Sequence, residues 1–255
     1  MQRKVEQISE KLADTVANWD GVVAIVLGDS ARVETFDPYF EIVFDVYFLG
    51  SLPPSNDRRE RLDNPGGFET SPVYPIDRFF VGELPVSMYY KEVARMNLLL
   101  NRVQDCEWVF RRESTNLLYR IEKGQVLFSK GEWFTELRQS TKKIPEGFWK
   151  SLMEAARFTL DRYLNGIGAA VYRNDHLYYQ LSASGFCQSL CSYIFALNKA
   201  FEPSGRLLHD HIKELSKLPR EFLGRFESLI RPDVDLSPER KFEIAKLLAT
   251  SISDS

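Results

Sequence analysis

The sequence predicts an α+β protein in which an N-terminal α/β domain with a mixed sheet precedes a C-terminal helical bundle. Short apolar runs bounded by glycine or by polar residues dominate the first half of the chain, which is typical of strands. Beyond about residue 142, nearly every segment has apolar residues at helical spacing. This change of pattern divides the 255 residues into a domain at 1–142 and a domain at 143–255.

Composition places the chain among ordinary soluble proteins. Hydrophobic residues make up 44% of it, charged residues 27%, and the formal net charge is −3. Without an excess of Lys and Arg, the chain lacks the field that attracts bulk nucleic acid, so we expect no such partner. No apolar run approaches the ~18 residues of a spanning helix. The start, MQRKVEQISE, lacks the apolar core of a secretory signal. Sparse cysteines fit a reducing compartment, and we expect a cytoplasmic protein with no membrane partner.

The first elements are a helix and two strands. Residues 3–19 have apolar side chains at every third or fourth position, which predicts an amphipathic helix. VVAIVLG at 22–28 is an apolar run that stops at a glycine, the pattern of a buried central strand. FEIVFDVYF at 40–48 is rich in β-branched and aromatic residues and predicts a second strand. Residues 50–75 carry prolines, glycines and charges without a period, so we expect a long mobile loop of the kind that forms lids.

After this loop, IDRFFVGELPVSMYY predicts a hairpin that turns at Gly82 and Glu83. Helical spacing returns from Lys91 to about Val103. The first half then ends with a helix near 112–119, a strand near 125–129 and a helix near 131–139. Beyond KKIPEGF, prolines separate the predicted helices. These helices span residues 146–165, 175–200, 207–217, 219–229 and 237–252.

Residues 27–48, LGDSARVETFDPYFEIVFDVYF, join a buried strand to an acidic strand through a turn with Gly and Ser. This arrangement resembles the nucleotidyltransferase superfamily, and more closely the branch of lincosamide and kanamycin nucleotidyltransferases and their uncharacterised bacterial relatives. That branch carries a pattern such as LGGSRARGTADPYSDIDLGLYY, which the chain follows without a gap. The motif TxDPY agrees outright, at Thr35, Asp37, Pro38 and Tyr39. PVSMYYKEVARM at 85–96 and YIFALNKAFEPSGR at 193–206 parallel two further family segments, so the resemblance spans most of residues 20–230.

The resemblance implies a phosphate-binding turn at Gly28, Asp29 and Ser30. In the family, backbone N–H groups and the serine hydroxyl of this turn hold the nucleotide phosphates. Residues i and i+2 of the following strand share a face ~6.6 Å apart, and a carboxylate at each holds a pair of Mg²⁺ ions. A third carboxylate comes from a neighbouring strand.

The chain departs from the family at these functional positions. The first metal carboxylate corresponds to Glu41, which keeps the acidic group. The second corresponds to Val43, which offers no oxygen to a hard cation, and the third to Ser87. Asp29 replaces a glycine and adds a negative charge beside the phosphates. The sequence therefore predicts the family scaffold with a degenerate metal site, in which Glu41 is the remaining candidate ligand.

Asp45 shares a strand face with Glu41 and is the nearest candidate replacement. Four strand positions separate the two by ~13 Å, whereas paired metal ions lie about 3.5–4 Å apart. Asp45 therefore does not reproduce the clamp. For Glu41 and Asp45 two interpretations stay open: a residual catalytic or cation-binding role, and ordinary solvent-facing side chains. Asp77 or Glu83 of the hairpin is a further candidate acid.

YRNDHLYYQ at 172–180 is the candidate substrate segment. In the resembling family this segment enters the bundle helix that faces the cleft between domains, where the acceptor binds. The resemblance implies that Arg173, Asp175, Tyr178 and Tyr179 line a small-molecule pocket there. The alternative interpretation is structural, because aromatic residues at helical spacing commonly pack in a core.

Two functions remain, together with a weaker third. The first is a nucleotidyltransferase-fold protein that has lost metal-dependent transfer and binds a nucleotide or small ligand in the interdomain cleft, with no cofactor. The alternative is a divergent enzyme that uses Mg²⁺ and a nucleoside triphosphate to transfer a nucleoside monophosphate to the hydroxyl of an antibiotic-like acceptor. The third is an interaction module that dimerises through the aromatic bundle surface. The oligomeric state stays open.

Overall fold

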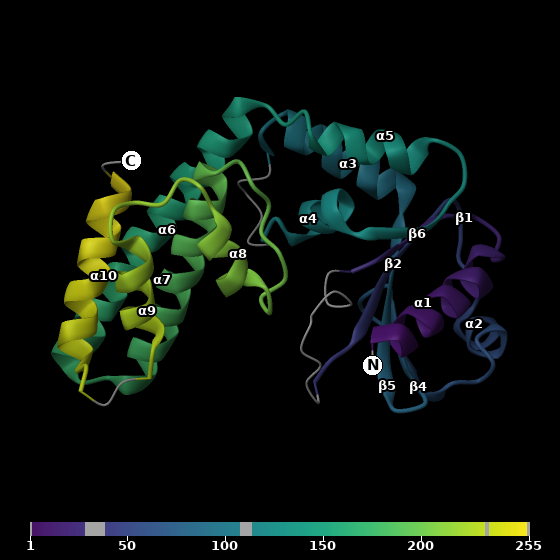
Figure 1. The fold of residues 1–255 in the computed structure, drawn as a ribbon, viewed down its shortest axis with the longest axis horizontal. Coiled ribbons are helices and arrows are strands. Elements are labelled where there is room, and N and C mark those ends of the chain that lie inside the picture. The colour runs from purple at the N-terminus through teal and green to yellow at the C-terminus, as the bar shows by residue number, and fades with distance from the viewer. Residues whose placement is uncertain (1, 29–38, 108–113, 233–234, 254–255) are drawn as a thin grey trace. The chain divides into compact units, whose positions relative to one another are not determined.

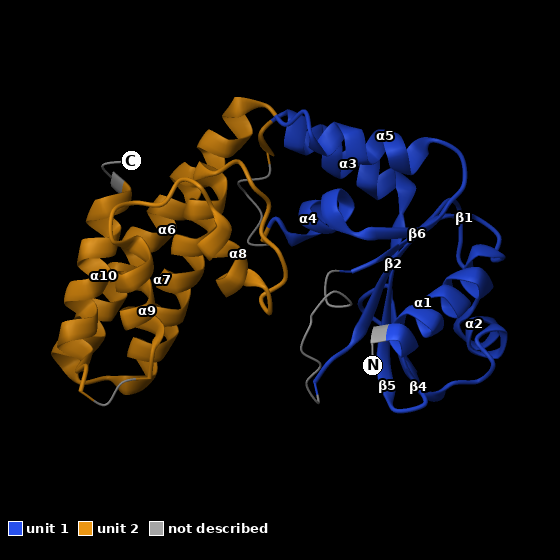
Figure 2. Ribbon diagram, in the orientation of Figure 1, with its two compact units in different colours: residues 1–105, 115–144 blue, residues 106–114, 145–255 orange. Residues whose placement is uncertain are grey.

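The computed structural model describes residues 2–28, 39–107, 114–232 and 235–253 (Figure 1). The chain forms two compact units, shown in Figure 2: residues 1–105 with 115–144, and residues 106–114 with 145–255. The first unit holds the sheet and the second is helical, so the predicted α+β class is confirmed. The first unit ends at residue 144, and segment 106–114 groups with the helical unit.

A six-stranded mixed sheet of order β3-β4-β5-β2-β1-β6 forms the centre of the first unit. β2 and β5 are parallel, and every other neighbouring pair is antiparallel. The buried strands and the hairpin occur where the sequence predicts them. The strands are β1 (Val22–Leu27), β2 (Ile42–Phe48), β3 (Gly66–Thr70), β4 (Ile76–Val81), β5 (Leu84–Glu92) and β6 (Gln125–Ser129).

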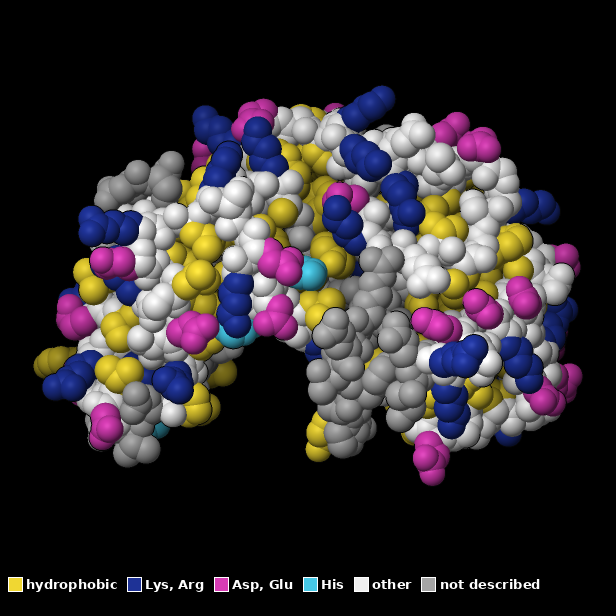
Figure 3. All heavy atoms as spheres, viewed as in Figure 1, with side chains coloured by type: hydrophobic (Ala, Val, Ile, Leu, Met, Phe, Trp, Pro, Cys, Tyr) yellow, Lys and Arg dark blue, Asp and Glu magenta, His cyan; other side chains and the backbone are white. Residues whose placement is uncertain are grey.

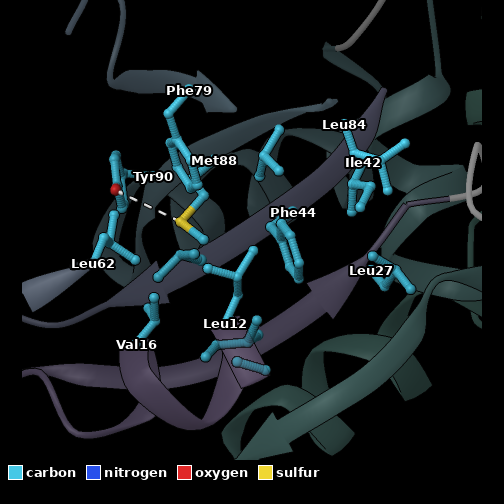
Figure 4. Close-up of a cluster of buried hydrophobic side chains, with 14 of the residues drawn as sticks. Leu12, Val16, Leu27, Ile42, Phe44, Leu62, Phe79, Leu84, Met88 and Tyr90 are labelled. Atoms are coloured by element: carbon cyan, nitrogen blue, oxygen red, sulfur yellow. Dashed lines mark hydrogen bonds between the residues drawn. The ribbon is translucent and has the colours of Figure 1, made fainter. Parts of the chain in front are cut away.

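One face of the sheet packs against α1 (Gln2–Ala17) and forms the main core of this unit. In Figure 4, Leu12 and Val16 of α1 lie over the side chains of the central strands, among them Phe44 and Met88. Side chains alternate between the two faces of a strand. Ile42, Phe44 and Val46 enter this core, so Val43, Asp45 and Tyr47 of β2 lie on the opposite face.

The opposite face is covered by α3 (Val93–Gln104), α4 (Asn116–Lys123) and α5 (Trp133–Thr141), as Figure 1 shows. The fully buried Tyr47 ring packs 5.2 Å from the ring of Phe134 on α5. Arg138 of α5 donates to the carbonyls of Ile121 at 2.8 Å and Gly124 at 2.6 Å. These bonds satisfy carbonyls at the end of α4, which is how a basic side chain stabilises a helix C-terminus.

The prediction of an unstructured loop over residues 50–75 is wrong. This segment contains the short helix α2 (Ser55–Arg61) and the edge strand β3. Arg58 of α2 points inward and is buried, although its neighbours in the sequence are polar. A helix anchored by one buried arginine has no apolar stripe, so hydrophobic periodicity does not reveal it.

The second unit is a helical assembly built on the long hairpin of α6 (Glu146–Arg173) and α7 (His176–Leu197). The prediction that α6 ends at residue 165 is wrong, because the helix continues through Gly166. A Cβ atom at Gly166 would lie 2.6 Å from Ser182 Oγ of α7. This glycine therefore permits close packing of the two helices and does not end α6. The remaining helices are α8 (Leu208–Glu214), α9 (Phe222–Ile230) and α10 (Pro238–Ser253).

The surface carries both signs of charge. On the face shown in Figure 3, basic and acidic side chains are interspersed. This mixed distribution agrees with the formal net charge of −3. Among the helices of the described residues, none combines the length and apolar character needed to cross a bilayer.

Candidate functional site

The candidate site lies on the helix-covered face of the sheet, where β2 and β5 run side by side. The parallel register places Val43 beside Ser87 and Asp45 beside Tyr89. Glu41 directly precedes β2 and is half-buried. The fully buried Ser87 donates a hydrogen bond from its hydroxyl to Glu41 Oε1. Glu41, Val43 and Ser87 therefore lie together, and Val43 lies between Glu41 and Asp45 on this face of β2.

Gly28 borders this group from the end of β1. Its N–H donates to the carbonyl of Val43 at 2.8 Å. A Cβ atom at position 28 would lie 3.3 Å from the same carbonyl oxygen and 3.4 Å from Val43 Cβ, so the approach favours glycine. Asp29 and Ser30, the other predicted residues of the phosphate turn, lie outside the described residues.

Asp45 is fully buried, so its solvent-facing interpretation is wrong. Lys91 Nζ of β5 and Arg120 Nη2 of α4 both approach its Oδ1 atom, at 2.6 Å and 2.5 Å. The two cations also contact aromatic rings, since Lys91 lies 5.7 Å from the centre of the Tyr47 ring and Arg120 lies 5.3 Å from that of Tyr89. An oxygen that already accepts from two cations is a poor ligand for a third, so these ion pairs oppose a metal-binding role for Asp45.

The Asp45 cluster is charged and buried. Burial lowers the pKa of Lys91 from 10.5 to about 8, although Asp45 acts in the opposite direction. Burial, followed by the charge of Asp45, raises the pKa of Tyr47 well above its ordinary value. Among the described residues, three buried polar atoms of this cluster lack a hydrogen-bond partner: Asp45 Oδ2, Tyr47 Oη and Arg120 Nε. Two buried cations, Lys91 and Arg120, therefore face one carboxylate, and the hydrogen bonding of the cluster is incomplete. The stability of this arrangement consequently depends on whether Lys91 is protonated.

Asp77 and Glu83 do not complete a metal site with Glu41. Asp77 pairs with Met88 in the β4–β5 register, which places it on the α1 face of the sheet. There it is fully buried and accepts from Arg58 Nε at 2.7 Å and Nη2 at 2.8 Å, and from the hydroxyls of Thr70 and Tyr90 at 2.7 Å each. Glu83 lies exposed in the turn between β4 and β5. Within the described residues, no group of three or more His, Cys, Asp or Glu is placed to hold a metal ion.

The predicted substrate residues lie at the junction of α6 and α7. Asp175 caps α7 by accepting from the Tyr178 backbone N–H at 2.9 Å. The Arg173 guanidinium lies 5.4 Å from the centre of the Tyr178 ring and 3.8 Å from Asp175. Tyr179 points elsewhere, because it packs against the core of the helical unit. The structure brings three of the four together, and their role as an acceptor pocket stays a prediction.

The sequence pattern did not reveal Lys91 and Arg120, which lie on β5 and α4 and form ion pairs with Asp45. One signal was available: a carboxylate inside the apolar run FEIVFDVYF needs a buried partner. Arg120 is 75 positions away in the chain, so its identity follows only from the packing of α4 on the sheet.

Comparisons with known proteins give a family match over part of the chain and a structural match over nearly all of it. Residues 110–220 match a family model described as a domain of unknown function, DUF4037. That stretch contains α4 and β6 but neither β2 nor β5. The crystal structure of a nucleotidyltransferase-like protein from Exiguobacterium sibiricum is similar, with 11% sequence identity and a TM-score of 0.49, over 98% of this chain and 74% of that chain. No curated protein matches the chain.

Proposed function

We propose that this chain is a nucleotidyltransferase-like protein that has lost metal-dependent nucleotidyl transfer and binds a nucleotide or small ligand at the face that carries Glu41. One observation carries the proposal: Val43 and Ser87 are neighbours in the β2–β5 register, next to Glu41. These are the positions at which the resembling family places its second and third carboxylates, so a single acid is left where catalysis by two metals needs three.

Neither Asp45 nor Asp77, the two buried acids of the described strands, supplies the missing oxygens. Asp45 is bound by Lys91 and Arg120, and Asp77 lies on the opposite face, bound by Arg58. A valine in place of a carboxylate removes a ligand of the metal ion, since aliphatic groups do not coordinate Mg²⁺. Gly28, at which the resemblance places the start of the phosphate turn, is held beside β2 by its hydrogen bond to the carbonyl of Val43, and this supports binding without transfer.

Titration calorimetry with ATP tests this proposal, once in the presence of Mg²⁺ and once in EDTA. We expect ATP affinities in the two conditions to agree within about threefold, because one carboxylate holds Mg²⁺ weakly. A parallel assay follows pyrophosphate release from ATP, GTP, CTP and UTP with aminoglycoside or lincosamide acceptors, and we expect none. Tight binding that requires Mg²⁺ and disappears in Glu41→Ala, or pyrophosphate release by the wild type, would contradict the proposal.

A further inference from the structure

The same face of the sheet carries an exposed cation beside the degenerate metal position. Arg78 of β4 lies directly opposite Ser87 in the antiparallel β4–β5 register. Directly opposed residues project to the same face, with Cβ atoms ~5 Å apart. Arg78 is exposed, and within the described residues its guanidinium makes no ion pair. Ser87 thus has Arg78 on one side and Val43, its β2 neighbour, on the other.

Arg78 and Glu41 both adjoin Ser87. The strand that carries Arg78 is two strands away from β2. Neighbouring strands are ~4.8 Å apart, so the two backbones are separated by ~10 Å and long side chains span much of that distance. A separation of this size is comparable with the screening length, which is ~10 Å at 0.1 M salt and ~8 Å in physiological salt, and a group bound between the two side chains lies closer to each of them.

The positive charge beside Ser87 therefore comes from a protein side chain and not from a bound metal ion. In a metal site, carboxylates hold divalent cations, and the cations bind phosphate. Here the protein itself supplies a guanidinium group, whose planar fork of donors matches the oxygens of a phosphate. On its other side, Arg78 lies directly opposite Glu69 of β3 in the β3–β4 register. Glu69 is exposed, and its carboxylate competes with phosphate for the Arg78 guanidinium.

We propose that Arg78 binds the anionic phosphate group of the ligand directly, in place of divalent metal ions. This inference rests on the proposed function and names the chemistry of its ligand: a polyphosphate-bearing molecule that binds without a metal. It also reverses the role of Glu41. With a metal, Glu41 helps phosphate to bind by holding the cation. Without one, Glu41 only repels phosphate, because both carry negative charge.

The test is calorimetry of the full chain in EDTA with two probes, ATP and tripolyphosphate. We expect Arg78→Gln to weaken the binding of both about 10- to 100-fold, the range for loss of a hydrogen bond to a charged group. We expect Arg78→Lys to keep part of the affinity, since lysine keeps the charge without the fork. Glu41→Gln is expected to strengthen binding about two- to fivefold, and Glu69→Gln to act in the same direction, because each removes a negative charge near the phosphate. Arg59→Gln, an exposed arginine of α2, is the matched control with unchanged affinity.

Each outcome decides between the two proposals. If ATP binds in EDTA and Arg78→Gln does not change its affinity, the Arg78 inference is wrong and the proposed function stands. If ATP binds only with Mg²⁺ and Glu41→Gln abolishes binding, both are wrong. If tripolyphosphate binds through Arg78 while ATP does not, the inference stands and the nucleotide is excluded as the ligand. If neither probe binds in EDTA, the inference is overturned. Thermal melts of every variant check that the fold is intact, as expected for the exposed positions 59, 69 and 78 and tested for the half-buried Glu41.

Discussion

Arg120 on α4 donates to Asp45 on β2 at 2.5 Å, and this contact joins two residues that are 75 positions apart in the chain. Both side chains are almost inaccessible to solvent, with 13% and 1% of their surface exposed. The pair fixes α4 to the sheet that also carries the candidate site. It therefore affects the function only through the stability and position of β2.

Asp45→Asn is expected to destabilise the protein by about 3–5 kcal/mol. Removing the carboxylate leaves Lys91 and Arg120 buried without a counter-charge, and an unpaired buried charge costs that much. Chemical denaturation followed by circular dichroism measures the change. Asp14→Asn, at an exposed position of α1, is the control and should change stability by less than about 0.5 kcal/mol. Equal effects of the two substitutions would show that the cluster is not the electrostatic anchor of this unit.

Lys91 should make stability depend on pH in an unusual direction. Its folded-state pKa of about 8 lies below the ordinary value of 10.5. Below pH 8 the amine is charged in both states, and its burial opposes folding. Between pH 8 and 10.5 the unfolded chain binds more protons than the folded chain, so the free energy of unfolding rises with pH. The gain from this residue is at most about 3 kcal/mol.

Lys91→Met isolates that effect. The difference between the unfolding free energies of wild type and variant should move in favour of the wild type as the pH rises from 8 to 10.5. The raised pKa values of Tyr90, Cys187 and Cys191 affect both proteins alike and cancel in this difference. Urea denaturation at half-unit pH steps provides the measurement. A difference that is flat over this range would mean that the amine titrates at its ordinary pKa.

Arg58 should contribute as much to stability on the α1 face of the sheet as Arg120 contributes on the opposite face. It is bidentate to the buried Asp77 and lies 5.1 Å from the centre of the Tyr90 ring. Arg58→Met leaves Asp77 with only two hydroxyl donors, so we expect a loss of about 3–5 kcal/mol. Because α2 is anchored by this arginine, hydrogen exchange should accelerate over residues 55–61 more than over β1. Arg61→Met, exposed on the same helix, is the control. Uniform acceleration across the unit would contradict a local anchoring role.

The sequence predicted the central strands because their patterns are local. Alternation of side chains along β2 was enough to place Glu41, Val43 and Asp45 on one face. The same reasoning failed for residues 50–75, where β3 is an exposed edge strand and α2 has no apolar stripe. The face on which Asp77 lies depends on the register of the hairpin, and the partners of Asp45 depend on how α4 packs. Such long-range contacts have no local signature.

Introducing two carboxylates at Val43 and Ser87 is the most direct test of the proposal that a metal site has been lost here. The double substitution Val43→Asp with Ser87→Asp places three acids on one face, because Val43 and Ser87 are register neighbours and Ser87 already contacts Glu41. Carboxylates at this spacing suit divalent cations. We expect Mg²⁺ binding to appear and the affinity for ATP with Mg²⁺ to exceed that in EDTA by at least about tenfold. The control is Val43→Asn with Ser87→Asn, which has the same shape without the charge. If both double variants fold but neither binds Mg²⁺, the backbone of this face is not that of a metal site, and its resemblance to the nucleotidyltransferases would not extend to the position of the ions.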